Sequence, residues 1–295
     1  MKIVQFHLPG IGQRVGIVEG ADVIDITTPS APTTLGLVVQ AGEQGKPLAE
    51  IAGNTPRGAA LSYAELSVAP APDVAHLLMP IDPPEIWGAG ITYERTATRY
   101  DEGAREETIY TRVYESDRPE IFFKSTAPRA VGPNAPIAVR ADSEQTSTEP
   151  EMAILLGVGG EIIAVTCCND VTARDIELEN PLYLPQAKTY SGSCAFGPTL
   201  VTLDEIPDPH GLEITCTIER GSESWSGAAS TGRMKRRVGE LVSWLMRDNP
   251  IPAGTVFTTG TGIVPPVEWC LLEGDVVRIE IGEIGELSNP VHKLA

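Results

Sequence analysis

Positive charge is scarce in this chain of 295 residues. Lysine and arginine together number 22, against 40 aspartates and glutamates, so the formal net charge is −18. Non-specific binding to nucleic acid needs many cationic contacts to phosphate. Docking on an anionic membrane surface needs clusters of basic residues. We therefore expect neither nucleic acid nor a membrane among the partners of this protein.

The sequence also lacks long apolar runs. No stretch approaches the ~18 charge-free apolar residues of a membrane-spanning helix, and the start is too polar, and too soon interrupted by Pro9-Gly10, for a signal peptide. The five cysteines are an odd number and include no CxxC pair, so neither a disulfide framework nor a structural zinc site is indicated. A reduced, cytoplasmic setting with buried free thiols is the expectation.

Histidine is equally scarce. Only four histidines occur, and none lies between residues 77 and 209. None has a serine or cysteine nucleophile in a suitable context, and no GxSxG is present, so a nucleophilic hydrolase is disfavoured. No GxGxxG or Walker motif opens a helix, which leaves nucleotide binding without support.

Turn-forming residues are frequent, with 29 glycines and 25 prolines, which favours short strands over a helical bundle. The segment Ser67–Asp73 has linker composition, and we place a boundary near residue 75, between a small N-terminal α+β domain (1–75) and a larger catalytic domain (76–295). Short β-rich segments in the larger domain predict a mostly β fold with some helix, a sandwich or roll. Two helices are expected there, over Arg95–Tyr114 and Gly232–Leu245.

The most informative motif is Glu149-Pro150-Glu151, directly before the apolar run Met152–Leu156. In an extended backbone, residues two apart point to the same side, so the two carboxylates share a face. If they are buried together, they must protonate or bind a cation. The missing N–H of Pro150 favours a strand edge or bulge, where a ligand can enter. The alternative for this motif alone is a solvated, acidic strand end.

A third carboxylate, Asp170, follows the predicted strand Ile162–Cys168. If that strand pairs with the one after Glu151 through the hairpin signal Gly157–Gly160, Asp170 lies close to the two glutamates. Three carboxylates without histidine or cysteine suit a hard cation, Mg²⁺ first, with Ca²⁺ or Mn²⁺ as alternatives. For Asp170 alone, helix capping is the alternative.

Arg174 and Lys188 follow these carboxylates along the chain. An acidic metal centre with cations nearby suits an anionic substrate that chelates the metal. The alternatives are a salt bridge for Arg174 and a solvated side chain for Lys188. The segment Thr258–Gly262 offers backbone N–H groups and hydroxyls that could cradle a carboxylate, although an ordinary strand-to-turn transition explains the same residues.

These residues resemble the fumarylacetoacetate hydrolase family. The matching positions are Glu149-Pro150-Glu151, the run NDVTARD over residues 169–175, Lys188 and Gly260-Thr261-Gly262, and the match covers about residues 80–290. The resemblance implies a mixed β-sandwich roll that forms a homodimer or higher homo-oligomer. It implies further that Glu149, Glu151 and Asp170 hold a divalent cation, and that Lys188 and Thr261 contact the substrate.

Other segments are similar to one branch of that family, the dehydratases of 2-keto-3-deoxy sugar acids. They include IWGAGITYE from residue 86, RPEIFFK from residue 118 and ENPLYLPQAK from residue 179. The hydrolases of the family carry a water-activating histidine after an Asn-Tyr step, whereas residues 92–99 here read TYERTATR. Cleavage of a carbon–carbon bond by water needs a positioned base, so this departure fits elimination. A second departure is Glu177, where many members have glutamine.

The resemblance therefore implies Mg²⁺-dependent dehydration of a 2-keto-3-deoxy sugar acid, with 2-keto-3-deoxy-D-arabinonate and its product 2,5-dioxopentanoate as the leading case. Lys188, with a pKa expected to fall on burial near the metal, is the first candidate for base or enolate stabiliser. Glu115 or Glu120 could protonate the leaving hydroxyl, with surface pairing to Arg112 or Arg118 as the alternative. The residues expected to orient the substrate are Arg174, Lys124, Thr261 and Gly260.

Two other functions stay open. The first is hydrolysis of an acylpyruvate or diketo acid, for which Glu94 is the nearest candidate for a water-activating base. The second is a non-catalytic protein that binds keto acids. Three carboxylates together with Lys188 disfavour the second function, because a protein that only binds does not need an open metal position.

Overall fold

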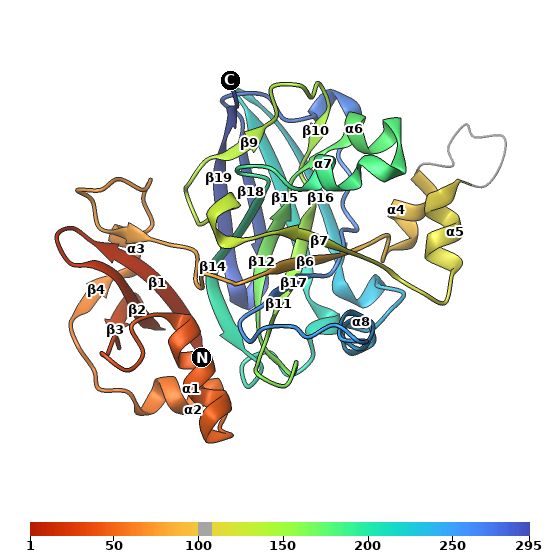
Figure 1. Cartoon of the computed structure of the whole chain (residues 1–295). Helices are drawn as coiled ribbons and strands as arrows, with labels where there is room; N and C mark the ends of the chain where they lie inside the picture. Colours follow the sequence, from red (N-terminus) through yellow and green to blue (C-terminus); the bar gives the residue numbers. More distant parts are fainter. Residues whose placement is uncertain (100–107) are drawn as a thin grey trace.

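The computed structural model describes residues 1–99 and 108–295, and Figure 1 shows a small N-terminal part beside a larger one. At the N-terminus, β1 and β2 pair antiparallel as a hairpin. The elements of this part, in chain order, are β1 (Lys2–Leu8), β2 (Gly12–Glu19), β3 (Asp22–Asp25), α1 (Thr34–Gln44), α2 (Leu48–Asn54), β4 (Ala60–Ser62) and α3 (Tyr63–Leu66).

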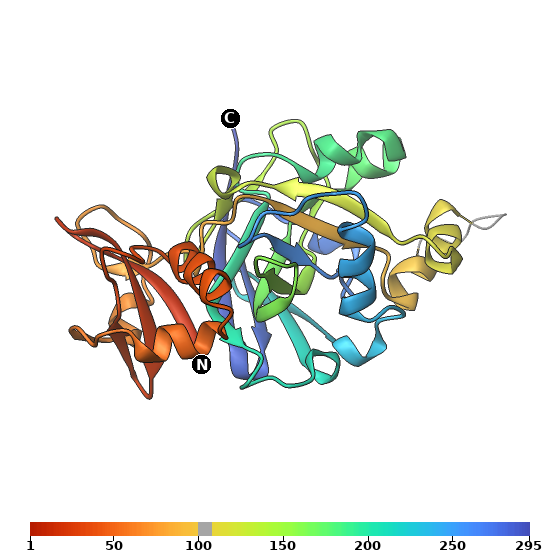
Figure 2. The same ribbon diagram turned by 60° about the horizontal axis from the view of Figure 1, so that its bottom comes forward.

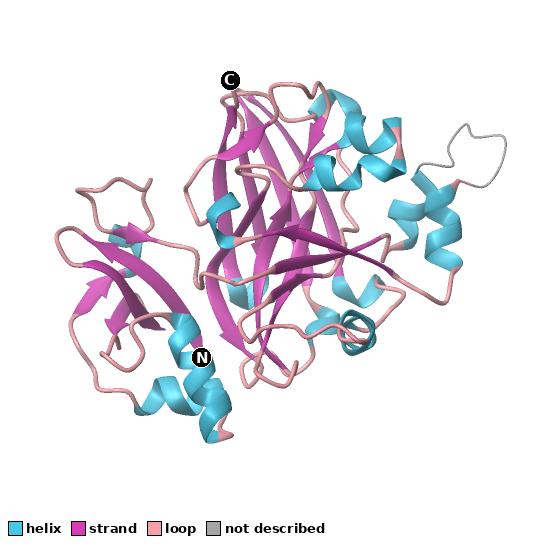
Figure 3. Cartoon of the chain, in the orientation of Figure 1, coloured by secondary structure: helices cyan, strands magenta, loops and turns pink. Residues whose placement is uncertain are grey.

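Strands are the main regular secondary structure of the larger part, with short helices at its periphery (Figure 3). Its first half comprises β5 (His76–Leu77), β6 (Ile86–Gly90), α4 (Glu94–Arg99), α5 (Ile109–Glu115), β7 (Glu120–Ser125), η1 (Ala127–Arg129), β8 (Ala130–Val131), β9 (Ile137–Val139), β10 (Thr146–Ser147), β11 (Pro150–Leu156) and β12 (Ile162–Asp170). Its second half comprises β13 (Thr172–Ala173), α6 (Arg174–Glu179), η2 (Pro181–Tyr183), α7 (Leu184–Lys188), β14 (Cys194–Thr202), η3 (Pro209–Gly211), β15 (Glu213–Arg220), β16 (Glu223–Ser230), η4 (Thr231–Arg233), α8 (Val238–Leu245), β17 (Val256–Thr258), η5 (Val267–Trp269), β18 (Val276–Ile281), η6 (Gly282–Ile284) and β19 (Gly285–Lys293).

Two large sheets form a sandwich, as the strand-rich sequence predicted. The first runs in the order β4-β3-β2-β1-β14-β12-β11-β17-β6-β7, and the second in the order β16-β15-β18-β19-β9. The apolar core between them joins Met152 and Ile154 of the first sheet to Cys216 and Ile279 of the second. Burial of such side chains is the main favourable term in folding, so this layer holds the two sheets together.

The first sheet crosses the expected domain boundary near residue 75, because β1 pairs antiparallel with β14. Leu37 and Val38 of α1 pack in one buried cluster with Leu155 of β11 and Phe196 of β14, and Figures 1 and 2 both show α1 at the junction of the two parts. Every residue of β11 and β14 is buried, whereas α5 buries none of its side chains. The N-terminal part therefore covers one face of the central strands.

Both predicted helices of the larger part differ from expectation. The helix expected over Arg95–Tyr114 is not continuous, since Thr108 is extended (φ −77°, ψ 168°) before α5; residues 100–107 lie outside the described residues. The second helix begins at Val238 and not at Gly232. The residues expected to form its first turn contact the segment before α4 instead. The Lys235 N–H donates to the Thr92 carbonyl at 2.9 Å, and this hydrogen bond replaces one that a helix would need.

All five cysteines are buried and none forms a disulfide, as the sequence predicted. Within the described ranges, the helices are too short or too polar to span a bilayer.

Candidate active site

The two glutamates of the sequence motif lie where β11 begins. On one side β11 pairs with β12, with Pro150 opposite Asn169, whereas on the other side β17 pairs only with Ala153–Leu155. The start of β11 therefore extends past the end of β17, in agreement with the edge position expected of a proline.

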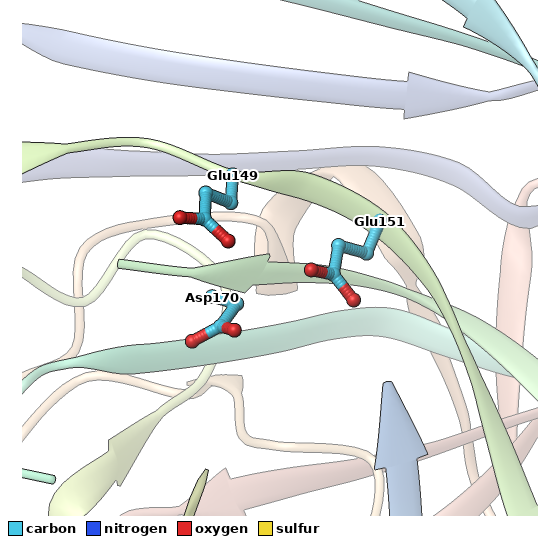
Figure 4. Close-up of side chains that lie close together, drawn as sticks. All are labelled: Glu149, Glu151 and Asp170. Carbon is cyan, nitrogen blue, oxygen red and sulfur yellow. The ribbon is translucent and has the colours of Figure 1, made fainter. Parts of the chain in front are cut away.

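The hairpin between β11 and β12 brings Asp170 to the two glutamates, as predicted. Carboxylate oxygens of Glu149, Glu151 and Asp170 lie within 4.8 Å of one another, and Figure 4 shows the three groups converging. Glu151 and Asp170 are almost fully buried. Three negative charges at this separation repel strongly in a buried site, so the cluster requires protons or cations.

Glu151 is the ligand that fits a cation most clearly. Its Oε2 accepts the Gly260 N–H at 2.7 Å, while its buried Oε1 has no hydrogen-bond partner among residues 1–99 and 108–295. Burial, and then the neighbouring Asp170 and Glu149, raise the pKa of Glu151 well above its ordinary value. An unpartnered carboxylate oxygen beside two further carboxylates is the donor set that Mg²⁺ takes, so the residues present fit the ion.

Gly260 approaches so closely that no side chain can replace its hydrogen. Its φ is +87°, and a Cβ there would lie 2.1 Å from Thr92 Oγ1. A residue with a side chain would need both a strained backbone and a displaced neighbour. The glycine thus fixes the N–H that orients the Glu151 carboxylate.

Lys188, at the end of α7, lies against the carboxylates. Its Nζ donates to Glu149 Oε2 at 2.8 Å, to Asp170 Oδ2 at 2.9 Å and to Thr172 Oγ1 at 2.8 Å. Burial alone would lower the pKa of Lys188, but Asp170 and Glu149 raise it well above its ordinary value. Without the cation the two carboxylates thus outweigh burial, and the fall in pKa expected for Lys188 beside a bound metal stays a prediction. In the metal-free arrangement Lys188 is an ammonium ion, which can stabilise an oxyanion.

Lys124 lies behind Asp170 rather than in the cavity. Its Nζ is 2.5 Å from Asp170 Oδ1 and donates to the carbonyls of Val171 and Lys188 at 2.8 Å and 2.7 Å. Burial alone would raise the pKa of Asp170, and the two lysines together hold it below its ordinary value. Asp170 is therefore an ionised carboxylate between two ammonium groups.

A narrow cavity of about 30 Å³ adjoins the three carboxylates. The predicted site residues that line it are Glu120, Glu149, Glu151, Asp170, Lys188, Gly260 and Thr261. Residues of the lining that the sequence analysis did not propose for the site include Thr96, Tyr110, Phe122, Glu177 and Leu184. A larger hollow of about 480 Å³ lies beside Glu94, Arg95 and Arg233, but it contains none of the three carboxylates, so we place the chemistry at the smaller cavity.

Glu120 reaches the cavity because β6 supplies glycines opposite β7. Gly88 pairs with Phe122 and Gly90 pairs with Glu120. A Cβ at Gly90 would lie 2.0 Å from Glu120 Oε2, so the carboxylate occupies the space that a side chain would take. Burial raises the pKa of Glu120, although Lys188 lowers it in part.

Glu177 of α6 is the second carboxylate on this side of the cavity. Burial raises its pKa to about 7, against the lowering effect of Lys188. The sequence analysis noted Glu177 only as a departure from the family pattern. Helical spacing alone could not predict that Glu177 lines the cavity, because this position depends on how α6 packs on α7.

Three predicted residues take other places. Glu115 is exposed and forms a surface ion pair with Lys235 at 2.9 Å, so surface pairing is what the structure shows, although with a different partner from the two arginines considered. Arg174 and Lys124 are buried but do not line the cavity. The Thr261 hydroxyl donates to the Pro150 carbonyl at 2.8 Å, which fixes the loop after β17 against the start of β11.

Comparison with known proteins gives close relatives. The fumarylacetoacetate (FAA) hydrolase C-terminal family matches residues 85–292. The chain is 52% identical over 219 residues to the 2-dehydro-3-deoxy-D-arabinonate dehydratase of Saccharolobus solfataricus, covering 72% of this chain and 74% of that one. It is 47% identical over 217 residues to the probable 2-keto-3-deoxyxylonate dehydratase of Haloferax volcanii, covering 73% and 75%.

A solved structure is similar over the whole chain. It is 2-keto-3-deoxy-D-arabinonate dehydratase complexed with magnesium and 2,5-dioxopentanoate, with a TM-score of 0.86, 39% identity, and coverage of 100% of this chain and 99% of that one. The family match spans more than half of the sequence and contains all three clustered carboxylates. The chain belongs to the fumarylacetoacetate hydrolase family.

Proposed function

We propose that this protein is a hydro-lyase that removes water from a 2-keto-3-deoxy sugar acid, with Mg²⁺ held by Glu149, Glu151 and Asp170. The observation that carries the proposal is the buried Glu151 Oε1, which lies beside two further carboxylates and has no hydrogen-bond partner in the part of the chain that the structure describes. The names of the two similar dehydratases, and the magnesium in the similar solved structure, support it. When bound, the cation supplies Lewis-acid polarisation of the 2-keto group, which makes the C3 proton more acidic.

Lys188 stabilises the negative charge that develops when that proton leaves. It is an ammonium ion at the cavity wall, and a fixed cation next to a developing enolate lowers the barrier because it needs no reorganisation during the reaction. This role differs from that of the base suggested by the sequence, and it is supported by the direction of the Lys188 donors, which point at Glu149 and Asp170.

Glu120 and Glu177 supply the proton transfers. Both line the cavity, and burial raises the pKa of both carboxyl groups, that of Glu177 to about 7. A carboxyl group with a raised pKa can serve as an acid or a base in catalysis. We assign Glu177 to the C3 proton and Glu120 to the departing C4 hydroxyl. Tautomerisation of the product of a pentonate then gives 2,5-dioxopentanoate.

The geometry favours elimination over hydrolysis of a carbon–carbon bond. Thr96 of α4 faces the cavity and its hydroxyl donates to the Thr261 carbonyl at 2.5 Å, so this wall offers a satisfied hydroxyl and not a base. Glu94 is exposed and lines the separate hollow. The candidate water-activating base of a hydrolase therefore lies outside the cavity that holds the carboxylates.

We further propose that residues 76–295 form the catalytic domain and residues 1–75 a supporting one, in a cytoplasmic homodimer or higher homo-oligomer. The packing of α1 on β11 and β14 favours a structural role for residues 1–75. The buried free thiols support a reducing compartment, and a two-fold dimer is the commonest assembly of soluble proteins.

The test is direct. Purified protein with Mg²⁺ is incubated separately with 2-keto-3-deoxy-D-arabinonate, its enantiomer and an acylpyruvate, and the products are identified by mass spectrometry. We expect 2,5-dioxopentanoate from at least one sugar acid, lost with EDTA and restored by Mg²⁺. Release of pyruvate from the acylpyruvate, with no turnover of either sugar acid, would refute the dehydratase.

A further inference from the structure

Lys124 is the most completely enclosed charged side chain around the site. It is fully buried and follows Glu120 and Phe122 along β7, at a register shift where Phe123 pairs with Trp87 and Ser125 with Ile86 of β6. Glu120 and Phe122 line the cavity, but Lys124 does not. The strand thus carries its first two alternate side chains to the cavity and the third into the protein behind Asp170.

Three oxygen atoms surround the Lys124 ammonium. Aligned hydrogen bonds go to the carbonyls of Val171 and Lys188, and a close ion pair of 2.5 Å goes to Asp170 Oδ1. Two of the three donors of the ammonium group are thus used by carbonyls, and the fully buried side chain does not line the cavity, so it does not face a substrate there. This arrangement argues against the contact with substrate that the sequence suggested for Lys124.

The same three oxygens belong to the two segments that the proposed chemistry needs most. Asp170 and Val171 stand at the end of β12, and Lys188 ends α7. The second oxygen of Asp170 accepts the Lys188 side chain at 2.9 Å, and the Lys188 carbonyl also accepts the Ser193 hydroxyl at 2.9 Å. Lys124 therefore links the side chain of one site residue to the main chain of another.

We propose that Lys124 is a positioning residue: its ammonium fixes the Asp170 carboxylate for the divalent cation and fixes the main chain from which Lys188 extends, without touching the substrate. The proposal rests on the metal site of the proposed function and deepens it. An uncharged side chain of similar length at position 124 would leave the Asp170 carboxylate free to turn toward Lys188. The three carboxylates would then all be present, but they would no longer have the geometry that the metal requires.

Two effects of replacing Lys124 change the affinity for Mg²⁺ in opposite directions, so a titration can distinguish them. Removing a positive charge beside Asp170 would by itself strengthen the binding of Mg²⁺. Loss of a residue that orients a metal ligand weakens binding, typically by 10–100-fold. We therefore expect Lys124→Met to raise the Kd for Mg²⁺, measured by calorimetry on the metal-free protein, by about 10–100-fold.

Arg220→Met is the matched control. Arg220 holds Asp275 at 2.9 and 2.7 Å and donates to the carbonyls of Glu268 and Cys270, so it makes the same kind of contacts in the second sheet. We expect Arg220→Met to lower the melting temperature but to leave the Kd for Mg²⁺ within about 2-fold. At saturating Mg²⁺ and with the sugar acid that is turned over, Lys124→Met should lower kcat and leave KM within about 3-fold.

Three results would overturn the proposal. They are an unchanged or lower Kd for Mg²⁺ in Lys124→Met, an equal rise in Arg220→Met, and a rise in KM with unchanged kcat, which would indicate contact with substrate. If Lys124→Met does not fold by circular dichroism, Lys124→Gln, which keeps two donors, carries the same titration; if neither folds, Lys124 serves the fold and not the site. The Mg²⁺ titration needs no turnover, so an inactive wild-type protein would refute the proposed function alone.

Discussion

The carboxylate of Glu120 packs against the backbone of Gly90 and fills the space that a side chain at position 90 would need. A Cβ at Gly90 would lie 2.0 Å from Glu120 Oε2. The two residues pair across β6 and β7, so the strand register itself fixes the contact. A cavity wall built in this way depends on a missing side chain as much as on a present one.

Gly90→Ala should therefore disable the site without disabling the fold. The new methyl group displaces Glu120, and misplacement of a catalytic group by about 1 Å costs about 100-fold in rate. We expect kcat/KM to fall by 10–100-fold while the circular dichroism spectrum is unchanged. Gly239→Ala is the control, because a Cβ at Gly239 of α8 meets nothing within 4 Å; a similar loss in that variant would contradict the interpretation.

Binding of Mg²⁺ should release a proton from the site. Glu151 has a pKa raised well above its ordinary value in the metal-free protein, and a metal takes the deprotonated carboxylate. The affinity for Mg²⁺ should consequently rise with pH, and the observed enthalpy should depend on the ionisation enthalpy of the buffer. Calorimetry in phosphate and in Tris checks this; identical enthalpies in both would show that Glu151 is already ionised.

Glu151→Gln should abolish the site. The amide keeps the volume and an acceptor for the Gly260 N–H, but removes the charge that the cation needs, so we expect the Kd for Mg²⁺ to rise by at least about 100-fold. Glu43→Gln, at an exposed position of α1, should leave the Kd unchanged. Tight Mg²⁺ binding by the Glu151 variant would place the metal elsewhere.

Glu177 should make stability depend on pH in the metal-free protein. Its pKa rises from 4.5 unfolded to about 7 folded, so the folded state binds the proton more tightly and stability falls as pH rises between these values. Glu177→Gln removes that loss, and we expect it to be more stable than wild type at pH 8, by at most ~3 kcal/mol, with the difference vanishing near pH 4.5. Thermal melts in EDTA, with Glu179→Gln as control, measure it; equal pH profiles would refute the raised pKa.

The same variant should be impaired in catalysis. If Glu177 removes the C3 proton, Glu177→Gln should lower kcat by about 10²–10⁴-fold and should stop the exchange of the C3 proton with deuterium oxide. Exchange that persists while dehydration stops would assign Glu177 to the leaving hydroxyl and Glu120 to the proton.

The catalytic domain should not fold without the first 75 residues. Leu155, Phe196 and Val256 lie in one buried cluster with side chains of α1 and α2, and removing the N-terminal part would expose that apolar face, which favours aggregation. We expect the fragment 76–295 to be insoluble or to bind a hydrophobic dye. A monodisperse, folded fragment would show that the two parts are independent domains.

The sequence predicted the carboxylate cluster because its geometry is local. Glu149 and Glu151 share a face by strand alternation, and a short hairpin returns Asp170 to them, so three residues meet through one pair of neighbouring strands. The sandwich was predictable from strand-rich segments for a similar reason. The choice between Glu115 and Glu120 was not predictable, because only four residues separate the end of a surface helix from the cavity wall, and only the glycines of β6 distinguish the two glutamates.

What escaped prediction depends on contacts between distant segments. The place of Lys124 follows from β7 lying against the end of α7, and the charge state of Lys188 follows from the two acids around its ammonium. Burial and pairing act on a pKa in opposite directions, and the sequence does not tell which is stronger. Glu177 reaches the cavity only through the packing of α6.

Full burial of β11 and β14 has a consequence for how a substrate arrives. Glu151 lies in β11 and Asp170 ends β12, which pairs with β14, so both carboxylates stand on strands that have a paired strand on each side. Tyr110 of α5 forms part of the cavity lining, and no side chain of α5 is fully buried. We therefore expect any movement that admits a sugar acid to involve α5, while the strands around the carboxylates stay in place.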